Sequence, residues 1–319
     1  MSSTISKNVA LIGVGRIGTR ILRALLATNQ ANVTVLTRSA KVNDAAHHHF
    51  FHFHPHEQPH PHKSLPSDLS SVPIVEADYN ATALAAILKE HNIEIVISTV
   101  NASGLKAQYV FADAAKLSGC VKLFVPSEWG VPTEGAQYLG EDNIFGQKDA
   151  FAEYLKKIEL PYTRFYTGIF IDSLPWLVGA ETNHAVNVLG KGETFFSVTS
   201  EEDIGGFVAH VITAFPSSSS RLKNQSLRIQ GDRITMRSLS RIYRKPLEFI
   251  PEGDEVPAKT PEEATLKTFL QIEADCGMAS TGWDRRTETE RGDAGSANKL
   301  WEGHVWQTVE DFAEAHRHL

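Results

Sequence analysis

Residues 8–18 read Asn8-Val9-Ala10-Leu11-Ile12-Gly13-Val14-Gly15-Arg16-Ile17-Gly18. The apolar run 8–12 has the length and composition of a buried strand. The following residues, 16–27, repeat apolar side chains at helical spacing, namely Ile17, Ile21, Leu22 and Leu25. A strand that passes through glycines directly into an amphipathic helix begins a β-α-β unit, so this stretch predicts a parallel sheet covered by helices.

The three glycines of this stretch have the spacing G-x-G-x-x-G. In a dinucleotide-binding turn the first glycine permits the tight turn, the second lets the backbone approach the pyrophosphate, and the third lets helix and strand pack closely. The pyrophosphate then lies against the positive end of the helix. An ordinary glycine-rich turn is the alternative, but the flanking strand and helix favour the dinucleotide site. The predicted cofactor-binding residues of the turn are Gly13, Val14, Gly15, Arg16, Ile17 and Gly18.

The end of the second predicted strand distinguishes NAD from NADP. An NAD site has an acidic residue about 20 positions past the turn, which binds the ribose 2′-hydroxyl. This chain has Thr37-Arg38-Ser39 there and no carboxylate before Asp44. The planar guanidinium of Arg38 can bind a 2′-phosphate through parallel hydrogen bonds. We therefore predict NADP(H), with Arg16 stacked on the adenine or making a second phosphate contact.

The first half of the chain continues to alternate strands and helices. The predicted fold class is α/β, a Rossmann doubly wound parallel sheet with a smaller α/β substrate lobe. We predict an NADP-binding domain over 1–160 and a mainly substrate-binding lobe over 161–319, which is discontinuous because parts return to the first domain. The predicted strands are 8–12, 33–36, 74–76, 93–99, 121–125, 162–166, 227–229 and 247–250, and the predicted helices are 16–27, 81–89, 105–117, 148–158, 203–214, 235–243 and one that begins at 308.

Composition narrows the classes of function. The chain has 319 residues and a formal net charge of −7, which argues against nucleic acid or an anionic membrane as a partner. Cys120 and Cys276 are too few for a disulfide framework and have no metal-type spacing. No apolar run approaches the ~20 residues of a bilayer span, and the N-terminus lacks a signal-peptide pattern. We expect a cytoplasmic protein with a small-molecule substrate, and the oligomeric state is not readable from sequence.

The segment 47–62 interrupts the connection between the second and third predicted strands. It contains eight histidines, and its prolines exclude a regular helix or central strand. Clustered imidazoles can hold a soft divalent metal. We favour a low-complexity surface insertion that binds metal only adventitiously, and we therefore predict no metal site.

A second group of polar residues follows the fifth predicted strand, in the order Val125-Pro126-Ser127-Glu128-Trp129-Gly130. Ligands of open α/β sheets bind at the carboxyl ends of the strands. Short-chain dehydrogenases usually carry Tyr-x-x-x-Lys in this region, but here Tyr154 is followed four residues later by Ile158, and Tyr138 by Asp142. A catalytic pair of tyrosine and lysine is therefore not expected, because Lys148 lacks the tyrosine of that motif.

The order of several motifs resembles the NmrA-like superfamily, and specifically its isoflavone reductase-like branch. The resemblance covers nearly the whole chain apart from the histidine-rich insertion. It is carried by the glycine turn, the arginine after the second strand, and the segments Ile97–Val100, Lys122–Gly130, Phe145–Lys148, Leu160–Thr163, Gly168–Phe170, Ser200–Gly205 and Thr308–Phe312.

The resemblance implies a reductase in which Lys148 is the general acid/base. A hydride would pass from NADPH to a small aromatic, enone or polyketide-like metabolite. A lysine shielded by cofactor and substrate has its charged form disfavoured, so its pKa moves toward neutrality. The resemblance also places Thr99, Val100 and Lys148 beside the cofactor. A surface lysine on the first turn of a helix is the alternative interpretation.

Several positions depart from the family pattern. Val14 and Arg16 stand where the family has threonine and tyrosine, and Trp129 stands for phenylalanine. Plant reductases often have arginine one turn after the lysine, where this chain has Ala152. Four aromatic residues are candidates for the substrate pocket, Trp129, Phe145, Tyr166 and Phe170, of which we favour Trp129 and Phe170.

Two further hypotheses remain open. Some NmrA-like proteins bind NADP and regulate a protein partner without turnover, and a protein of that kind has no need of Lys148 in this setting. A metal-binding protein built around the histidine segment is weaker, and it predicts zinc binding that is lost when residues 47–62 are deleted. We favour the enzyme.

Overall fold

The protein is described by a computed structural model that covers residues 6–38, 66–77 and 80–316. Of Arg38 only the backbone is described. The histidine-rich segment 47–62 lies outside the described residues, so the interpretation of that segment stays a prediction.

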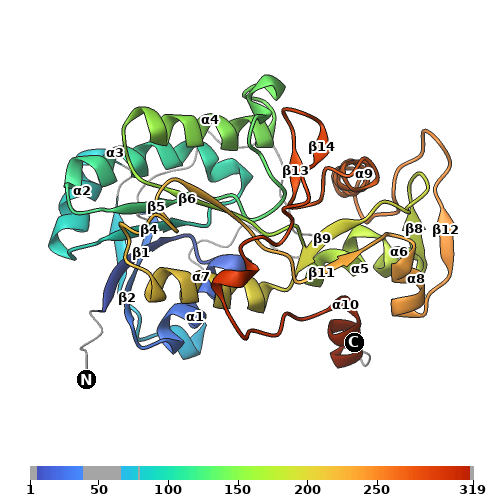
Figure 1. Ribbon diagram of the computed structural model, residues 1–319, viewed down its shortest axis with the longest axis horizontal. Coiled ribbons are helices and arrows are strands. Elements are labelled where there is room, and N and C mark those ends of the chain that lie inside the picture. Colours follow the sequence, from blue (N-terminus) through green and yellow to red (C-terminus); the bar gives the residue numbers. More distant parts are fainter. Residues whose placement is uncertain (1–5, 39–65, 78–79, 317–319) are drawn as a thin grey trace.

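A parallel sheet of five strands forms the centre of the larger lobe (Figure 1). Its order is β3-β2-β1-β4-β5, and every neighbouring pair is parallel. The order reverses between β1 and β4, which is the switch point where ligands of doubly wound sheets bind. The strands are β1 (Lys7–Ile12), β2 (Ala31–Arg38), β3 (Ile74–Ala77), β4 (Ile95–Ser98) and β5 (Leu123–Val125). This sheet confirms the predicted Rossmann fold.

Two later strands extend this sheet beyond β5. Single bridges join Phe124 to Tyr162 and Gly130 to Tyr166, which places β6 (Thr163–Tyr166) beside β5. Strand β10 (Gln225–Arg228) then pairs with β6 in parallel.

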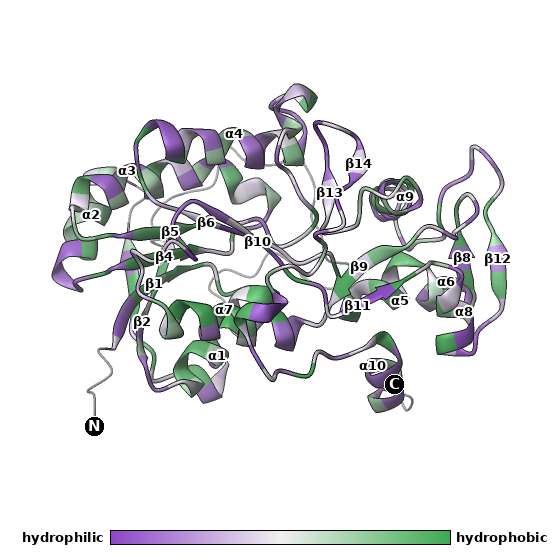
Figure 2. Ribbon diagram, in the orientation of Figure 1, coloured by the Kyte–Doolittle hydropathy of each residue, from purple (hydrophilic) through white to green (hydrophobic). Residues whose placement is uncertain are grey.

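Helices cover both faces of the sheet (Figure 1), and strands β4 and β5 are coloured hydrophobic along most of their length in Figure 2. Val9 and Leu11 of β1 pack with α1 (Arg16–Ala27) and α7 (Glu201–Ala214), while Ala10 and Ile12 face the opposite core. That core contains residues of α2 (Ala81–Glu90), α3 (Gln108–Ser118) and α4 (Ile144–Lys157). The strand alternation of side chains thus separates two hydrophobic cores.

The smaller lobe has a third core and short strands. Its three-stranded sheet has the order β11-β9-β7, and β8 pairs with β12. Its elements are β7 (Ile169–Phe170), α5 (Leu174–Leu177), α6 (Ala180–Asn183), β8 (Val186–Val188), β9 (Phe196–Thr199), β11 (Asp232–Ile234), α8 (Ser238–Tyr243), β12 (Leu247–Phe249), α9 (Pro261–Asp275), the hairpin β13 (Trp283–Asp284) and β14 (Thr289–Glu290), and α10 (Val309–Ala315). The 3-10 helices of the whole described chain are η1 (Ser67–Leu69), η2 (Ala102–Ala107), η3 (Ala136–Leu139), η4 (Ile171–Ser173) and η5 (Asn298–Leu300).

Residues of β6, α7, β10 and η5, all of which come after residue 160, pack in the larger lobe. The division into 1–160 and 161–319, with a discontinuous second lobe, stays a proposal. Helix α4 begins at Ile144 and not at the predicted residue 148, because the side chain of Asn143 accepts from the backbone N–H groups of Phe145 and Gly146. Lys148 therefore lies on the second turn of α4 and not on its first.

Candidate functional site

The glycine turn is held against the end of β4. Gly13 has a φ of +90°, and a Cβ there would come within 2.8 Å of the Thr99 carbonyl oxygen. A Cβ on Gly18 would collide with the Gly13 carbonyl and lie 2.5 Å from Thr99 Oγ1. The Thr99 hydroxyl donates to the Gly13 carbonyl at 2.7 Å, and the Thr99 N–H donates to Ile12 at 2.8 Å. Gly13 and Gly18 are therefore required by the packing of the turn itself.

Gly15 is different, because the protein does not require a glycine there. Its φ is −71°, and a Cβ would meet no protein atom within 4 Å. Gly15 precedes α1 and makes no side-chain cap, and the first turn of α1 contains no acidic residue. The first N–H groups of a helix have no partner inside the helix. The space beside Gly15 therefore fits the predicted pyrophosphate, which a side chain at this position would obstruct.

Arg16 makes contacts that the sequence did not predict. Its guanidinium forms an ion pair with Glu201 and donates to Ser173 Oγ at 3.2 Å. These contacts join the turn to α7 and η4. The predicted contact of Arg16 with the adenine or with a phosphate stays a prediction. A single sequence cannot reveal this pairing because Glu201 is far away along the chain.

The remaining predicted cofactor residues differ in exposure. Ile17 is buried in the core beneath α1, and Val14 packs against the same core from the turn. Val100 packs, partly buried, against the opposite core. Arg38 ends β2 beside Ala77 of β3, and the contacts of its side chain lie outside the description. Its role toward a 2′-phosphate stays a prediction.

Lys148 is partly buried on α4, and its Nζ donates to the main-chain oxygen of Glu128 at 2.5 Å. Burial lowers the pKa of the Lys148 ammonium below its ordinary value. The nearby Glu128 carboxylate opposes this decrease, and the Arg164 guanidinium adds to it. The Lys148 ammonium thus releases its proton more readily than an ordinary lysine, and it has a defined position beside the loop after β5.

A buried ionic network supports this position. Arg164 Nε donates to Glu128 Oε1 at 2.7 Å, and its Nη1 donates to Asp149 Oδ1 at 3.1 Å. Thr133 donates to the other Glu128 oxygen at 2.9 Å, and the Gly135 N–H donates to Asp149 at 2.9 Å. Burial alone would lower the pKa of Arg164, but the surrounding negative groups raise it well above its ordinary value. The guanidinium thus stays charged and ties β6 to the loop 128–135 and to α4.

Sequence reasoning missed Arg164 and Asp149 as parts of the site. One signal was available, because Arg164 lies within the predicted strand 162–166, next to the aromatic Phe165. A charge in a strand covered on both faces requires a buried counter-charge. The sequence could not identify the partners, since the fold brings them together.

The two favoured aromatic residues lie at the edge of the core. Trp129 has a φ of +42°, and its indole N–H donates to the Ser98 carbonyl at 2.9 Å. Its ring stacks on Phe165, with 5.6 Å between centroids. Trp129 and Phe170 are both partly buried against the core beneath α1 and α7. The loop after β5 is further tied to the end of β4, because the Ser127 hydroxyl donates to the Val100 carbonyl at 2.7 Å.

The other two aromatic candidates are core residues. Phe145 is 7% exposed and packs against Phe269 and the Arg285 guanidinium. Tyr166 is fully buried, with the guanidinium carbons of Arg164 and Arg228 5.4 and 5.1 Å from its ring centre. Neither is placed as an exposed pocket wall.

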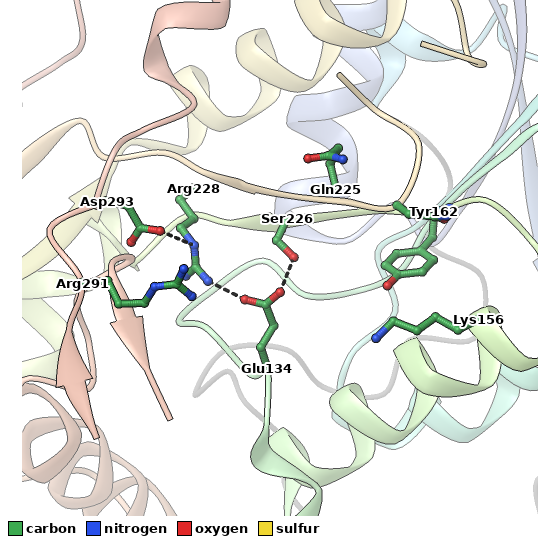
Figure 3. A pocket seen from close by; sticks show the side chains of 9 residues that line it. Glu134, Lys156, Tyr162, Gln225, Ser226, Arg228, Arg291 and Asp293 are labelled. Carbon is green, nitrogen blue, oxygen red and sulfur yellow. Dashed lines mark hydrogen bonds and ion pairs between the residues drawn. The ribbon is translucent and has the colours of Figure 1, made fainter. Parts of the chain in front are cut away.

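A polar pocket of about 480 Å³ lies along β10 and the end of α4 (Figure 3). Both of its carboxylates pair with one arginine of the same pocket. Arg228 is paired with Glu134 and Asp293, and Ser226 donates to Glu134 at 2.7 Å. The lining residues are Glu134, Lys156, Tyr162, Asn224, Gln225, Ser226, Arg228, Arg291 and Asp293, and they include none of the predicted site residues.

Two features of the described residues bear on the predictions. Within 6–38, 66–77 and 80–316, no group of three or more His, Cys, Asp or Glu side chains is arranged to hold a metal ion. No helix in these same ranges is long and apolar enough to cross a membrane.

The geometry can be compared with known proteins. Over 234 residues the chain is 28% identical to phenylcoumaran benzylic ether reductase PT1 of Pinus taeda, which covers 69% of this chain and 74% of that protein. The crystal structure of an isoflavone reductase superposes with a TM-score of 0.71 at 18% identity, covering 98% of this chain and 100% of that one. The binary complex of leucoanthocyanidin reductase and NADPH from Vitis vinifera superposes with a TM-score of 0.69 at 18% identity, covering 97% and 98%.

The NmrA-like family model matches residues 6–313, which is nearly the whole chain. The two solved structures superpose over 97% and 98% of this chain, and at 18% identity this likeness supports the fold alone. The chain belongs to the NmrA-like family.

Proposed function

We propose that this protein is an NADP(H)-dependent reductase of a small aromatic, enone or polyketide-like metabolite. The observation that carries the proposal is the position of Lys148, held by the Glu128 carbonyl after β5. The glycine turn follows β1 at the same carboxyl edge of the sheet. The pine relative is by name a reductase, and the grape neighbour is a complex with NADPH. These likenesses support a redox function for this site.

The cofactor half of the proposal rests on the turn 13–18. Gly13 and Gly18 set its shape, and Gly15 leaves room for a pyrophosphate at the start of α1. We assign the 2′-phosphate to Arg38, and we place Val14, Arg16, Ile17, Thr99, Val100 and Lys148 beside the cofactor. When bound, NADPH supplies a hydride.

Lys148 acts as the proton donor or acceptor. An ammonium has three N–H donors, and the Glu128 carbonyl takes one of them. The lowered pKa makes release of the proton to a substrate oxyanion easier, and Arg164 holds the loop that fixes the donor. Trp129 and Phe170 supply apolar surface for an aromatic or enone substrate.

Steady-state oxidation of NADPH with a panel of phenolic and enone metabolites tests this function. Lys148→Ala should lower kcat by about 10²–10⁴-fold, with NADPH binding nearly unchanged. Lys156→Ala is the matched control, because Lys156 lies on the same helix in an exposed pair with Glu153. Full activity of Lys148→Ala on a good substrate would refute the assignment. Tight NADPH binding without turnover of any compound would instead favour a cofactor-sensing regulator.

A further inference from the structure

Arg16 replaces the family's tyrosine in the glycine turn and has a partner that the family pattern does not predict. Its guanidinium is paired with Glu201, whose side chain is only 3% exposed, while that of Arg16 is 37% exposed. The same guanidinium donates to Ser173 in η4, the segment that follows β7. One side chain thus connects the turn with both α7 and η4.

The position of Glu201 is defined by the fold. It is the first residue of α7, directly after the N-cap Ser200, and its N–H donates to Asp172 Oδ2 at 3.3 Å. Helices α1 and α7 pack closely, since a Cβ on Gly205 would come within 2.9 Å of the Arg20 backbone. The carboxylate therefore has little freedom to move away from Arg16.

The groups around this carboxylate come from three elements. Arg16 and Arg20 belong to α1, Glu202 is the neighbour on α7, and Asp172 lies on η4. Tyr243 of α8 interacts electrostatically with Asp172. Burial raises the pKa of Glu201 to about 7, with Asp172 adding to the increase and the two arginines opposing it. Glu201 thus changes its charge near neutral pH.

We propose that Glu201 is a positioning residue of the cofactor site: through Arg16 it sets how much positive charge the turn presents to the cofactor phosphates, so that cofactor binding takes up a proton. The inference rests on the proposed NADP(H) site. A pyrophosphate at the start of α1 and the Glu201 carboxylate compete for the charge of Arg16. Protonation of Glu201 removes the competitor and leaves Arg16 to the cofactor.

The sign follows from linkage. The bound phosphates are like charges to the carboxylate, so they raise the pKa of Glu201 above its value of about 7 in the free protein. A ligand that raises a pKa binds more tightly in the protonated state, so NADPH affinity increases as the pH falls through this range. Coupling between two linked sites typically changes an affinity about 5–150-fold, and a like-charge repulsion screened by solvent lies near the low end of this range. The expected effect on the Kd is thus about tenfold.

Measurement of the Kd for NADPH between pH 6 and 9 on the full chain tests the inference. The wild-type Kd should rise about tenfold from pH 6 to pH 9. The Kd of Glu201→Gln should lack this rise and stay low over the whole range. The 2′-phosphate titrates near pH 6 in both proteins, so the difference between the profiles isolates Glu201. Glu202→Gln is the matched control, because Glu202 is exposed and pairs with Arg20, and its profile should follow the wild type. Arg16→Gln should move the step to higher pH and weaken binding.

Calorimetry of the wild type in buffers of different ionisation enthalpy provides a readout that needs no variant. Uptake of roughly half a proton per NADPH near pH 7.5 is expected when protonation of Glu201 is linked to a tenfold change in the Kd. Parallel profiles of wild type and Glu201→Gln, or no proton uptake, would overturn the inference while NADPH binding itself stood. Failure of the wild type to bind NADPH at any pH would instead overturn the proposed function, and the inference with it.

Discussion

Replacement of Arg164 by methionine should destabilise the protein strongly, because it leaves two buried carboxylates without their counter-charge. Arg164, Glu128 and Asp149 are each 2% exposed. The guanidinium makes charge-assisted hydrogen bonds of 2.7 and 3.1 Å to the two carboxylates. Removal of one partner from a buried ionic group costs about 3–5 kcal/mol. We therefore expect Arg164→Met to lower the free energy of unfolding by an amount in this range.

The expected change in melting temperature follows from the size of the chain. A protein of 319 residues has an entropy of unfolding of about 0.7 kcal/mol/K near 60 °C, so this loss lowers the Tm by roughly 4–7 °C. Thermal unfolding followed by circular dichroism measures it. The kcat should also fall, since Arg164 holds the loop whose Glu128 carbonyl binds Lys148.

Two controls define the result that would refute this reasoning. The triple variant Arg164→Met, Glu128→Gln, Asp149→Asn removes the carboxylate charges as well and should recover most of the stability. Arg237→Met breaks an exposed pair with Glu193 and should cost at most about 1 kcal/mol. If Arg164→Met were as stable as Arg237→Met, the network would not hold the loop as described.

Three further predictions concern the cofactor turn and its neighbours. Gly15→Ala should weaken NADPH binding more than tenfold at nearly unchanged stability, because its new Cβ meets no protein atom. Gly18→Ala should in addition lose about 1–3 kcal/mol of stability, because its new Cβ collides with the protein. NADPH-binding and unfolding assays of the two variants separate these effects. Arg38→Ala should weaken NADPH far more than NADH, and equal losses in the two Kd values would contradict the 2′-phosphate assignment. The pKa of Glu201 is raised from 4.5 to about 7 in the folded protein, so its contribution to stability declines as the pH rises through this window. Chemical denaturation should show Glu201→Gln more stable than wild type by about 3 kcal/mol at pH 8 and by little at pH 4. A difference in the free energy of unfolding that did not change with pH would contradict this prediction.

The larger lobe could be predicted from sequence because its signals are local. The apolar run before Gly13 and the periodic helix after it need no distant partner to be recognised. The start of α4 was missed although Asn143 is a good N-cap residue, and α9 was not predicted although Thr260-Pro261-Glu262-Glu263 is a typical helix start. These two errors came from weak periodicity and not from missing information.

The interior of the site could be predicted only in part, because its contacts join distant segments. The sequence identified Lys148 and the loop after β5, but not the network of Arg164 beneath them. Arg16 was predicted to reach the cofactor, and the structure pairs it with Glu201 of α7. The sequence offers many carboxylates as possible ion-pair partners for Arg16. The packing of α1 against α7 places the Glu201 carboxylate beside it.

The most direct test of the account is transfer of deuterium from NADPH labelled at the nicotinamide C4 to a metabolite, followed by mass spectrometry. The account predicts one deuterium atom in the product formed by the wild type and by Lys156→Ala, and at most a trace with Lys148→Ala. Absence of label from every phenolic and enone compound, with NADPH bound tightly, would contradict a reductase and leave a protein that only binds the cofactor.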